Sequence, residues 1–208
     1  MDIEIKKLSS KLTEDFLYAF DNPAFFGYSD FSFGCYCTWY NWTDELENER
    51  SKCNDKSKKH FKRNLAVKLI EEGKLNGFMA YFEGSVVGWC NAGLRQNYER
   101  LCREIEIQTN ASDKKIASIV CYVVHPNMQR KGIATALLKA VIDYARNENY
   151  DFVEAYPGVN TDGSPTSHGS YSMYEKQGFE LINTASNNMI MRLKLQNRRY
   201  FHPSQNNS

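Results

Sequence analysis

The chain has no charge excess, no long apolar run and no apolar leader. Its 208 residues include 26 basic and 25 acidic side chains, which leaves a net charge of +1. Such a balance provides no overall field that attracts nucleic acid or an anionic membrane surface. No apolar run approaches the roughly 20 residues that span a bilayer, and the N-terminal MDIEIKKLSS has no signal-peptide core. We therefore expect a cytoplasmic protein with no nucleic-acid or membrane partner.

The cysteines also fall short of a metal or disulfide framework. There are 6 of them, and without a secretory signal reduced thiols are expected. Cys35 and Cys37 form a C-x-C pair, and Cys53 and His60 are conceivable further ligands. A second closely spaced pair, which a structural zinc site needs, is missing from the sequence. The sequence therefore predicts no metal.

What the chain does contain is an apolar strand, a short polar turn and the start of a helix, one after the other. Ile116–Val124 is apolar on both faces, as in the middle of a sheet. The turn through Gln129–Gly132 leads into a helix at Ile133. The first amides of a helix have no partner inside it, and the helix dipole adds partial positive charge. The turn is therefore predicted to bind an anion, most simply a phosphate, although an ordinary strand-to-helix connection has the same spacing.

The other predicted elements complete a single α/β domain. A strand, a helix and a second strand at 116–156 imply a right-handed crossover and a parallel pair. Segments 78–82 and 86–91 flank a short Gly-containing turn, which is typical of a hairpin. Segment 43–60 is charged and exposed, and Ser57 is the expected cap of the next helix. Further elements are expected as a helix at 12–20 and strands at 3–5, 104–108, 180–183 and 189–195.

A second motif, YSMYEKQGF, lies at Tyr171–Phe179. It has the form of a short helix closed by Gly178, after which the chain returns into a strand. The two motifs, Q-x-x-G-x-A after an apolar strand and Y-E-K-x-G-F later in the chain, together resemble the GNAT superfamily of acyl-CoA-dependent N-acyltransferases. The resemblance covers roughly residues 75–195.

The resemblance implies a GNAT fold of the α/β class, with a mixed, mostly antiparallel central sheet that contains a splayed parallel strand pair and is flanked by helices. It also implies transfer of an acetyl group from acetyl-CoA to a primary amine of a small molecule or peptide. A catalytically silent acyl-CoA-binding sensor of the same fold is the alternative. Residues 1–74 are expected to form a helical, aromatic-rich, substrate-side part, 75–195 the acyl-CoA-binding core and 196–208 a tail. A homodimer would be typical of the family.

By the same resemblance, the main-chain amides of Arg130–Thr135 hold the CoA pyrophosphate, and the side chains of Arg130 and Lys131 add charge. Gly132 lets the phosphates approach the main chain. The strand residues before the turn pair their main chain with the pantetheine arm, as an added strand does. The expected cofactor-binding residues are Val123, Val124, Gln129, Arg130, Lys131, Gly132, Ile133, Ala134, Thr135 and Tyr174.

Tyr174 matches the family position whose hydroxyl donates to the CoA sulfur. A phenol, with a pKa of about 10, can supply a proton to a departing thiolate; the alternative is an aromatic ring packed under its helix. The general base is open, because several family members carry a glutamate near Ser118 and this strand has none. His168 is taken as the second catalytic residue. The alternatives are water relays and the side chains of Glu104, Glu106, Glu154 and His125.

The acceptor side is expected in the aromatic-rich segment Phe25–Trp42. This segment mixes aromatic residues, glycines and cysteines without a regular period, and family members commonly close this region over the acceptor. Core filling under a loop is the alternative. The expected acceptor-pocket residues are Tyr36, Trp39, Tyr40 and, on the central strand, Ser118.

Overall fold

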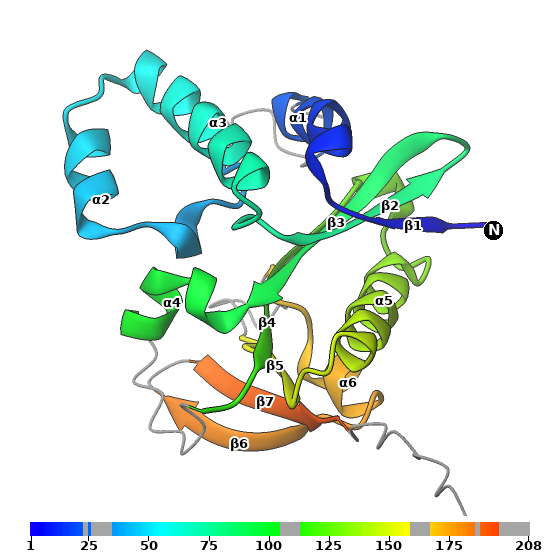
Figure 1. Ribbon diagram of the computed structural model, residues 1–208. Coiled ribbons are helices and arrows are strands. Elements are labelled where there is room, and N and C mark those ends of the chain that lie inside the picture. Colours follow the sequence, from blue (N-terminus) through cyan, green and yellow to red (C-terminus); the bar gives the residue numbers. More distant parts are fainter. Residues whose placement is uncertain (23–24, 26–34, 105–112, 159–166, 186–187, 196–208) are drawn as a thin grey trace, which may run out of the picture.

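A computed structural model of the protein describes residues 1–22, 25, 35–104, 113–158, 167–185 and 188–195 (Figure 1). Its strands are β1 (Glu4–Lys7), β2 (Gly77–Phe82), β3 (Ser85–Leu94), β4 (Ile116–Val124), β5 (Phe152–Ala155), β6 (Glu180–Ala185) and β7 (Asn188–Lys194). Its α-helices are α1 (Thr13–Asp21), α2 (Asp44–Ser51), α3 (Asp55–Glu71), α4 (Glu99–Glu104), α5 (Ile133–Asn147) and α6 (Tyr171–Glu175). Short 3-10 turns lie at η1 (Ser10–Leu12), η3 (Trp39–Asn41), η4 (Arg95–Asn97) and η5 (Pro126–Met128).

Some sequence predictions fall on parts of the chain that the structure does not describe. The expected tail at 196–208 lies outside the described residues. The same holds for 26–34 in the aromatic-rich segment. Of the strand expected at 104–108, only Glu104 is described, and it ends α4 instead.

The described strands form one sheet in the order β1-β2-β3-β4-β5-β7-β6. Within this part of the chain β4 and β5 are the one parallel pair, joined through α5 by the predicted crossover, and the other neighbours run antiparallel. Pairing of β4 with β5 stops at Ile119 opposite Ala155, whereas β4 continues to Val124. The mixed sheet with a parallel pair that parts, as expected from the sequence, is confirmed.

An extra residue in β4 marks the place where the two strands part. Asn91 of β3 pairs with Cys121, and the next residue, Ala92, pairs with Ile119, so Val120 is left over. Such a β-bulge bends a strand and increases its local twist. The bulge directly follows the last residue of β4 that pairs with β5, and so it turns β4 away from β5.

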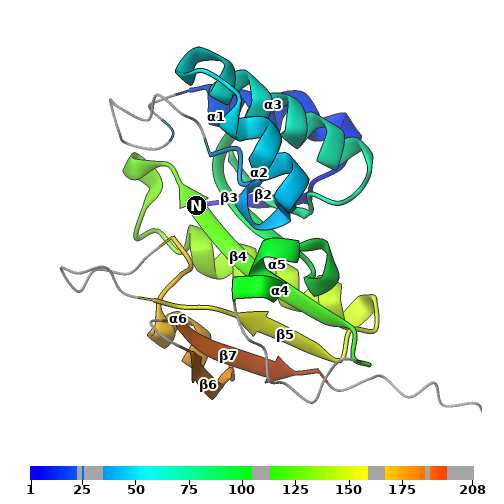
Figure 2. The ribbon, with the colours of Figure 1, turned by 90° about the vertical axis from the view of Figure 1, so that its left-hand side faces the viewer.

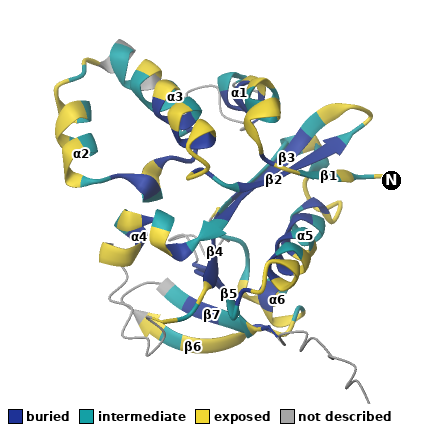
Figure 3. Ribbon diagram, viewed as in Figure 1, coloured by how far each residue is buried: buried dark blue, intermediate teal, exposed yellow. Residues whose placement is uncertain are grey.

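Helices cover both faces of the sheet. Helices α5 and α6 pack on one face, while α1 and α3 lie on the other (Figures 1 and 2). The buried residues form layers on both sides of the strands (Figure 3). Burial of a large apolar side chain contributes about 1.5–3 kcal/mol, and α5 buries a stripe at helical spacing. Its members include Leu137, Leu138, Val141, Ile142 and Ala145.

A glycine allows the start of α5 to approach β3. Gly88 pairs with Val124, and a Cβ added at Gly88 would lie 2.8 Å from Cγ2 of Ile133. Ile133 is the first residue of α5 and is 2% exposed. This close contact holds the beginning of α5 over β3, beside the end of β4.

Side chains cap two helices in the N-terminal part, and one of these caps differs from the sequence prediction. Thr43 caps α2 by accepting a hydrogen bond from the amide of Leu46 at 3.3 Å. Asn54 caps α3 by accepting from the amide of Ser57 at 2.9 Å. The expectation that Ser57 is the cap is therefore wrong, because Ser57 lies inside the helix; asparagine is among the residues preferred at this position. Gly73, with a positive φ of 66°, follows the end of α3, where glycine is preferred.

Candidate functional site

The turn between β4 and α5 presents main-chain amides to the outside. Gly132 is the N-cap of α5 and has a φ of 83°, a conformation that favours glycine. A glycine cap has no side chain to bond the first-turn amides, and that turn reads Ile-Ala-Thr in Ile133–Thr135. Arg130, Lys131 and Gly132 are exposed. Unbonded amides at a helix start beside two cations suit an anion, as the sequence predicts.

Gln129, which was also expected to bind the cofactor, contacts the protein itself. Its Nε2 donates to the main-chain oxygen of Val124 at 3.3 Å. This bond ties the turn to the last residue of β4, and so it fixes the turn relative to the gap beside β5.

Val123 turns its main chain toward β3. It pairs with Trp89, and the amide of His125, two residues later, donates to the oxygen of Val87 in β3 at 3.0 Å. Main-chain groups of alternate residues point to the same side of a strand. The structure therefore does not place Val123 where its main chain could pair with a ligand in the gap.

Tyr122 and Val124 turn their main chains toward the gap left where β5 ends. The amide of Tyr122 donates to the oxygen of Ser167 at 2.6 Å, and the oxygen of Val124 accepts from Gln129. A ligand in the gap would meet these two residues. The hydrogen bond of His125 to β3 shows which alternate residues of β4 turn their main chain toward β3, and these include Val123 but not Tyr122 or Val124. The sequence alone does not show this, because it requires the pairing of β4 with β3.

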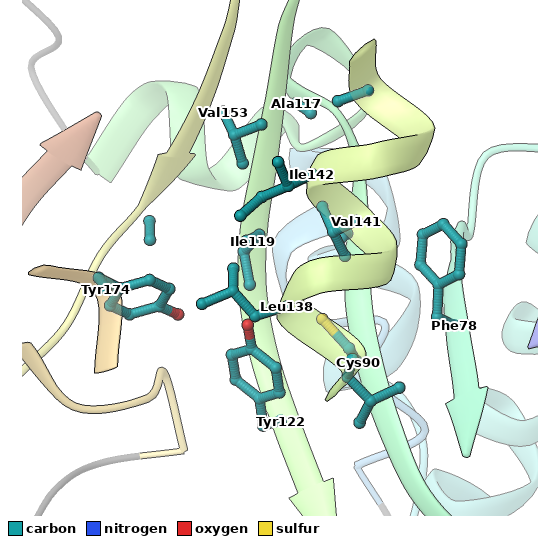
Figure 4. Close-up of a cluster of buried hydrophobic side chains, with 14 of the residues drawn as sticks. Phe78, Cys90, Ala117, Ile119, Tyr122, Leu138, Val141, Ile142, Val153 and Tyr174 are labelled. Atoms are coloured by element: carbon teal, nitrogen blue, oxygen red, sulfur yellow. The ribbon is translucent and has the colours of Figure 1, made fainter. Parts of the chain in front are cut away.

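Tyr174 is buried beneath α6 and faces the end of β4. Its side chain is 0% exposed, and its hydroxyl donates to the main-chain oxygen of His168 at 2.6 Å. Figure 4 shows the hydroxyls of Tyr174 and Tyr122 pointing toward the same place beside Leu138. Burial raises the pKa of Tyr174 well above its ordinary value, so this phenol keeps its proton and can act as a donor.

His168 lies between Tyr174 and the aromatic-rich segment. Its Nε2 is 3.0 Å from the hydroxyl of Tyr40. Burial lowers the pKa of His168, because desolvation disfavours the charged ring. The imidazole is therefore neutral near pH 7 and can accept a proton. The structure brings together the two residues predicted as catalytic, Tyr174 and His168, and adds Tyr40 to them.

The other residues expected in the acceptor pocket separate into a surface residue and a core residue. Trp39 is 41% exposed, and the guanidinium of Arg100 lies 3.7 Å from its ring centroid. Tyr36 is 0% exposed, and its hydroxyl donates to Asp21. Tyr36 therefore lies in the core on the α1 side, away from Tyr40 and His168. The sequence prediction did not include Arg100, which occurs in a polar stretch with no distinguishing spacing.

Ser118 belongs to a buried polar network. Its Oγ lies 2.7 Å from the hydroxyl of Tyr156, which donates to Glu154 at 3.0 Å. Glu154 is 0% exposed and also accepts from Arg95 at 3.0 Å and from Nε of Arg192 at 2.8 Å. The sequence prediction missed both arginines. A visible signal was the position of Arg192 within the apolar run M-I-M-R-L.

These contacts narrow the choice of general base. The two oxygens of Glu154 already accept hydrogen bonds from two guanidinium groups and a phenol, so they face these donors of the protein itself and not an incoming amine. Nδ1 of His125 accepts from the amide of Asn127 at 3.3 Å and so caps η5. Glu106 lies outside the described residues, and nothing is described of the Glu104 side chain. Among the described candidates, His168 has the geometry of a base.

Two further properties concern the described ranges as a whole. Within them, no group of three or more His, Cys, Asp or Glu side chains is arranged to hold a metal ion. No helix in the same ranges combines the length and the apolar character needed to cross a membrane.

Comparison with known proteins gives the family context. The sequence model of the Acetyltransferase (GNAT) family matches residues 36–179, whereas a search of curated proteins returns no match. Among solved structures, the chain is similar to the PaiA N-acetyltransferase from Thermoplasma acidophilum in complex with coenzyme A, at 19% identity and a TM-score of 0.50, covering 93% of this chain and 99% of that chain. It is also similar to an N-acetyltransferase from Staphylococcus aureus Mu50, at 15% identity and a TM-score of 0.54, covering 94% and 100%. A third is the ribosomal-protein-alanine N-acetyltransferase from Brucella melitensis, at 17% identity and a TM-score of 0.52, covering 92% and 99%.

At these sequence identities, similarity to the solved structures is evidence for the fold alone. The family match is independent of them and spans both motifs, from the turn after β4 to the Tyr174 helix. Because it covers more than half of the sequence, the chain belongs to the GNAT acetyltransferase family.

Proposed function

We propose that the protein transfers an acetyl group from acetyl-CoA to a primary amine of a small molecule or peptide. One observation carries this proposal: Ser167 and His168 lie where β4 and β5 part, and the side chains of Tyr174 and Tyr40 both bond His168. A proton donor and a proton acceptor therefore meet at the opening of the sheet. Family membership supports acetyl transfer, and the PaiA structure, which contains coenzyme A, supports the choice of donor.

The CoA diphosphate would bind at the start of α5. The amides of Ile133–Thr135 would donate to the phosphate oxygens, and Arg130 and Lys131 would add positive charge. The φ of 83° at Gly132 disfavours residues that carry a side chain, so this turn needs a glycine. Space is not the reason, because a Cβ at this position would meet no atom within 4 Å. The pantetheine arm would run along the main chain of Val124 and Tyr122, and its groups would replace the Ser167 oxygen at the Tyr122 amide.

The chemistry needs a neutral amine, a polarised carbonyl and a proton for the departing thiolate. His168 would take the proton from the attacking amine. A main-chain amide at the gap, from Tyr122 or Val124, would bond the oxyanion of the tetrahedral intermediate. As the C–S bond breaks, the Tyr174 hydroxyl would turn from the His168 oxygen to the sulfur and give its proton to the thiolate. The products would be an N-acetyl amide and CoA, and transfer of the proton from His168 to the Tyr174 phenolate would then restore both groups.

The acceptor amine would enter on the side of Tyr40 and Trp39. These residues belong to the N-terminal part, residues 1–74, which we therefore assign to acceptor binding. We place the reaction in the cytoplasm. The ring of Trp39 and the guanidinium of Arg100 form a stacked wall beside this entrance. A flat face of this kind holds a cation or a planar group by stacking.

Mass spectrometry of the reaction products tests the proposal. The protein is incubated with acetyl-CoA and a panel of amines that includes peptides with free N-termini, polyamines and aminoglycosides, and both CoA and N-acetyl product are quantified. We expect equal amounts of both with at least one amine, and loss of both in Tyr174→Phe. Absence of CoA binding by calorimetry, together with absence of product, would refute it.

A second candidate function is acyl-CoA binding without transfer. It is favoured by the fact that the Tyr122 amide and the Tyr174 hydroxyl are both occupied by main-chain oxygens of Ser167 and His168. The two functions differ in the Tyr174→Phe variant. A silent binding protein would show CoA binding and no rate that this substitution changes, whereas an enzyme would lose turnover and keep its affinity for CoA.

A further inference from the structure

A second buried hydroxyl, which the reaction described above does not use, lies beside the proposed proton donor. Tyr122 is 8% exposed, and its hydroxyl oxygen is buried without a hydrogen-bond partner among the described residues. Its neighbour across the strands is Cys90 of β3, and a thiol is only a weak hydrogen-bonding group. A buried hydroxyl without a partner destabilises a fold. Because native proteins leave few buried polar groups unpaired, this hydroxyl requires an explanation.

The hydroxyl of Tyr122 points toward that of Tyr174. Both residues belong to the buried cluster under α5, and Figure 4 shows their hydroxyls directed at the same place beside Leu138. Main chain lies against the Tyr174 hydroxyl as well. The oxygen of His168 accepts its hydrogen bond at 2.6 Å, and a Cβ added at Gly169 would lie 2.9 Å from its oxygen. The two phenols therefore face each other among buried side chains, where water does not screen them.

The proposed proton transfer needs a hydrogen-bond donor at this place. When Tyr174 gives its proton to the thiolate, its O–H bond breaks, an S–H bond forms, and a phenolate remains at a position that is 0% exposed. A buried anion without a hydrogen bond is costly, so burial opposes the transfer. A neighbouring donor stabilises the ionised phenol and so favours it. The hydroxyl of Tyr122 is such a donor, and no described acceptor holds its proton.

We propose that Tyr122 is a positioning residue for acetyl transfer, and that its hydroxyl donates a hydrogen bond to the Tyr174 oxygen while that oxygen is a phenolate. This inference rests on the proposed function. Tyr122 keeps its proton throughout, and no covalent bond forms or breaks at its side chain. A hydrogen bond to a charged oxygen is shorter and about twice as strong as a neutral one. The contact that is open in the resting protein therefore closes as the negative charge develops on Tyr174.

Tyr122→Phe tests this role, because it removes the hydroxyl and keeps the ring. The hydroxyl has no described partner in the resting protein, so its loss leaves no group unpaired, and the melting temperature should stay the same or rise. An interaction made only as charge develops changes kcat and not KM. We therefore expect kcat to fall about tenfold or more, with KM for acetyl-CoA unchanged. In a Tyr174→Phe background the same substitution should not lower kcat further.

Tyr81→Phe is the matched control. Tyr81 is a buried tyrosine of β2, 4% exposed, and its hydroxyl donates to Asp15 at 2.7 Å. Loss of a hydroxyl that has a partner should lower the melting temperature and leave kcat unchanged, because β2 lies two strands away from β4. The two variants should therefore show opposite patterns of stability and rate. A merely structural role of the Tyr122 hydroxyl would give both variants the pattern of the control.

A titration without substrate separates this inference from acetyl transfer itself. Tyr174 is replaced by a fluorinated tyrosine, whose phenol ionises at lower pH, and its fluorine NMR shift is followed against pH in the full-length protein. Adding Tyr122→Phe should raise the midpoint by about 1 pH unit, because the ionised phenol loses its donor, whereas Tyr81→Phe should leave it unchanged. An unchanged midpoint or an unchanged kcat in folded Tyr122→Phe would overturn the proposal. A raised midpoint in a protein that acetylates no amine would refute the proposed function and support the hydrogen bond.

Discussion

The hydroxyl of Tyr40 lies 3.0 Å from Nε2 of His168, and the main-chain oxygen of the same histidine accepts from Tyr174. The histidine thus joins the aromatic-rich segment on one face of the sheet to the α6 motif on the other. The link passes through the gap where β5 has ended, beside the amide of Tyr122. The proposed catalysis depends on this junction, in which one short piece of chain holds both the proton acceptor and the proton donor.

Replacement of His168 by glutamine should remove the base while keeping a group that can bond Tyr40. A positioned base contributes typically 10²–10⁴-fold to a rate, so we expect kcat/KM to fall about 100-fold or more in His168→Gln. Tyr40→Phe keeps the ring and removes the hydroxyl, and a smaller loss of about tenfold is expected. If Tyr40 acts through His168, the double variant should be no slower than His168→Gln, which a double-mutant cycle on kcat/KM measures. Additive losses in the double variant would contradict the proposal that Tyr40 acts through His168.

The pH dependence of activity should report the burial of His168. Burial lowers its pKa, so the neutral form persists below the ordinary value of about 6.5, and kcat/KM should lose activity only below that pH. Folding stability should also decrease as the pH falls. The unfolded chain binds more protons than the folded one as pH falls through about 6.5, so the free energy of unfolding decreases there. Urea titrations at pH 5 to 7.5 should show this decrease in the native sequence and a smaller one in His168→Gln. An acid limb at or above pH 7 would exclude His168 as the base.

Tyr174→Phe should separate catalysis from binding. Loss of the phenol proton should lower kcat about 100-fold, while the calorimetric affinity for CoA stays the same, because the diphosphate contacts lie at the start of α5. Removal of the bond to the His168 oxygen costs about 1 kcal/mol of folding stability, measured by urea unfolding. An unchanged kcat in a folded variant would contradict the proton-donor role.

A charge placed in the first turn of α5 should move stability and CoA affinity in opposite directions. Thr135→Glu adds a carboxylate that the helix dipole stabilises by about 0.3–1 kcal/mol, yet this charge repels the diphosphate. Thr135→Gln is the matched neutral control. We expect a similar or higher melting temperature for the glutamate variant and roughly tenfold weaker CoA binding than for glutamine, about 1.4 kcal/mol. Equal affinities of the two variants would place the diphosphate elsewhere.

Glu154→Gln should destabilise the protein strongly. The carboxylate is 0% exposed and lies between Arg95 and Arg192, so its neutralisation leaves two guanidinium groups without a counter-charge. Breaking a buried ion pair in this way costs about 3–5 kcal/mol, which urea unfolding measures. The control is Glu71→Gln, at an exposed position at the end of α3, with an expected change within about 0.5 kcal/mol. If Glu154→Gln changes the free energy of unfolding little but changes the pH profile of kcat strongly, Glu154 and not His168 would be the general base.

Local sequence signals were sufficient for the central part of the fold. The apolar run Ile116–Val124 forms β4 with the predicted bounds, because residues apolar on both faces fit only the middle of a covered sheet. The YSMYEKQGF motif forms the short helix, and Gly178 has the positive φ of 84° expected after it. Cap positions were harder to assign, since Asn54 and Ser57 are both plausible caps and tertiary placement decides between them.

Other features depend on contacts between distant parts of the chain, which single-sequence patterns do not carry. The ion pairs of Glu154 require Arg95 and Arg192 to lie on neighbouring elements across the sheet. The difference between Tyr36, which lies in the core, and Tyr40, which reaches His168, arises from two successive left-handed residues at Tyr36 and Cys37. Neither residue type predicts that conformation.

The most direct test of the central claim is a crystal structure of the protein with CoA bound. We predict the diphosphate on the amides of Ile133–Thr135 and the sulfur within about 3.5 Å of the Tyr174 hydroxyl, with the pantetheine along Tyr122 and Val124. A diphosphate bound elsewhere, with the Tyr174 hydroxyl still on the His168 oxygen and far from the sulfur, would contradict the account.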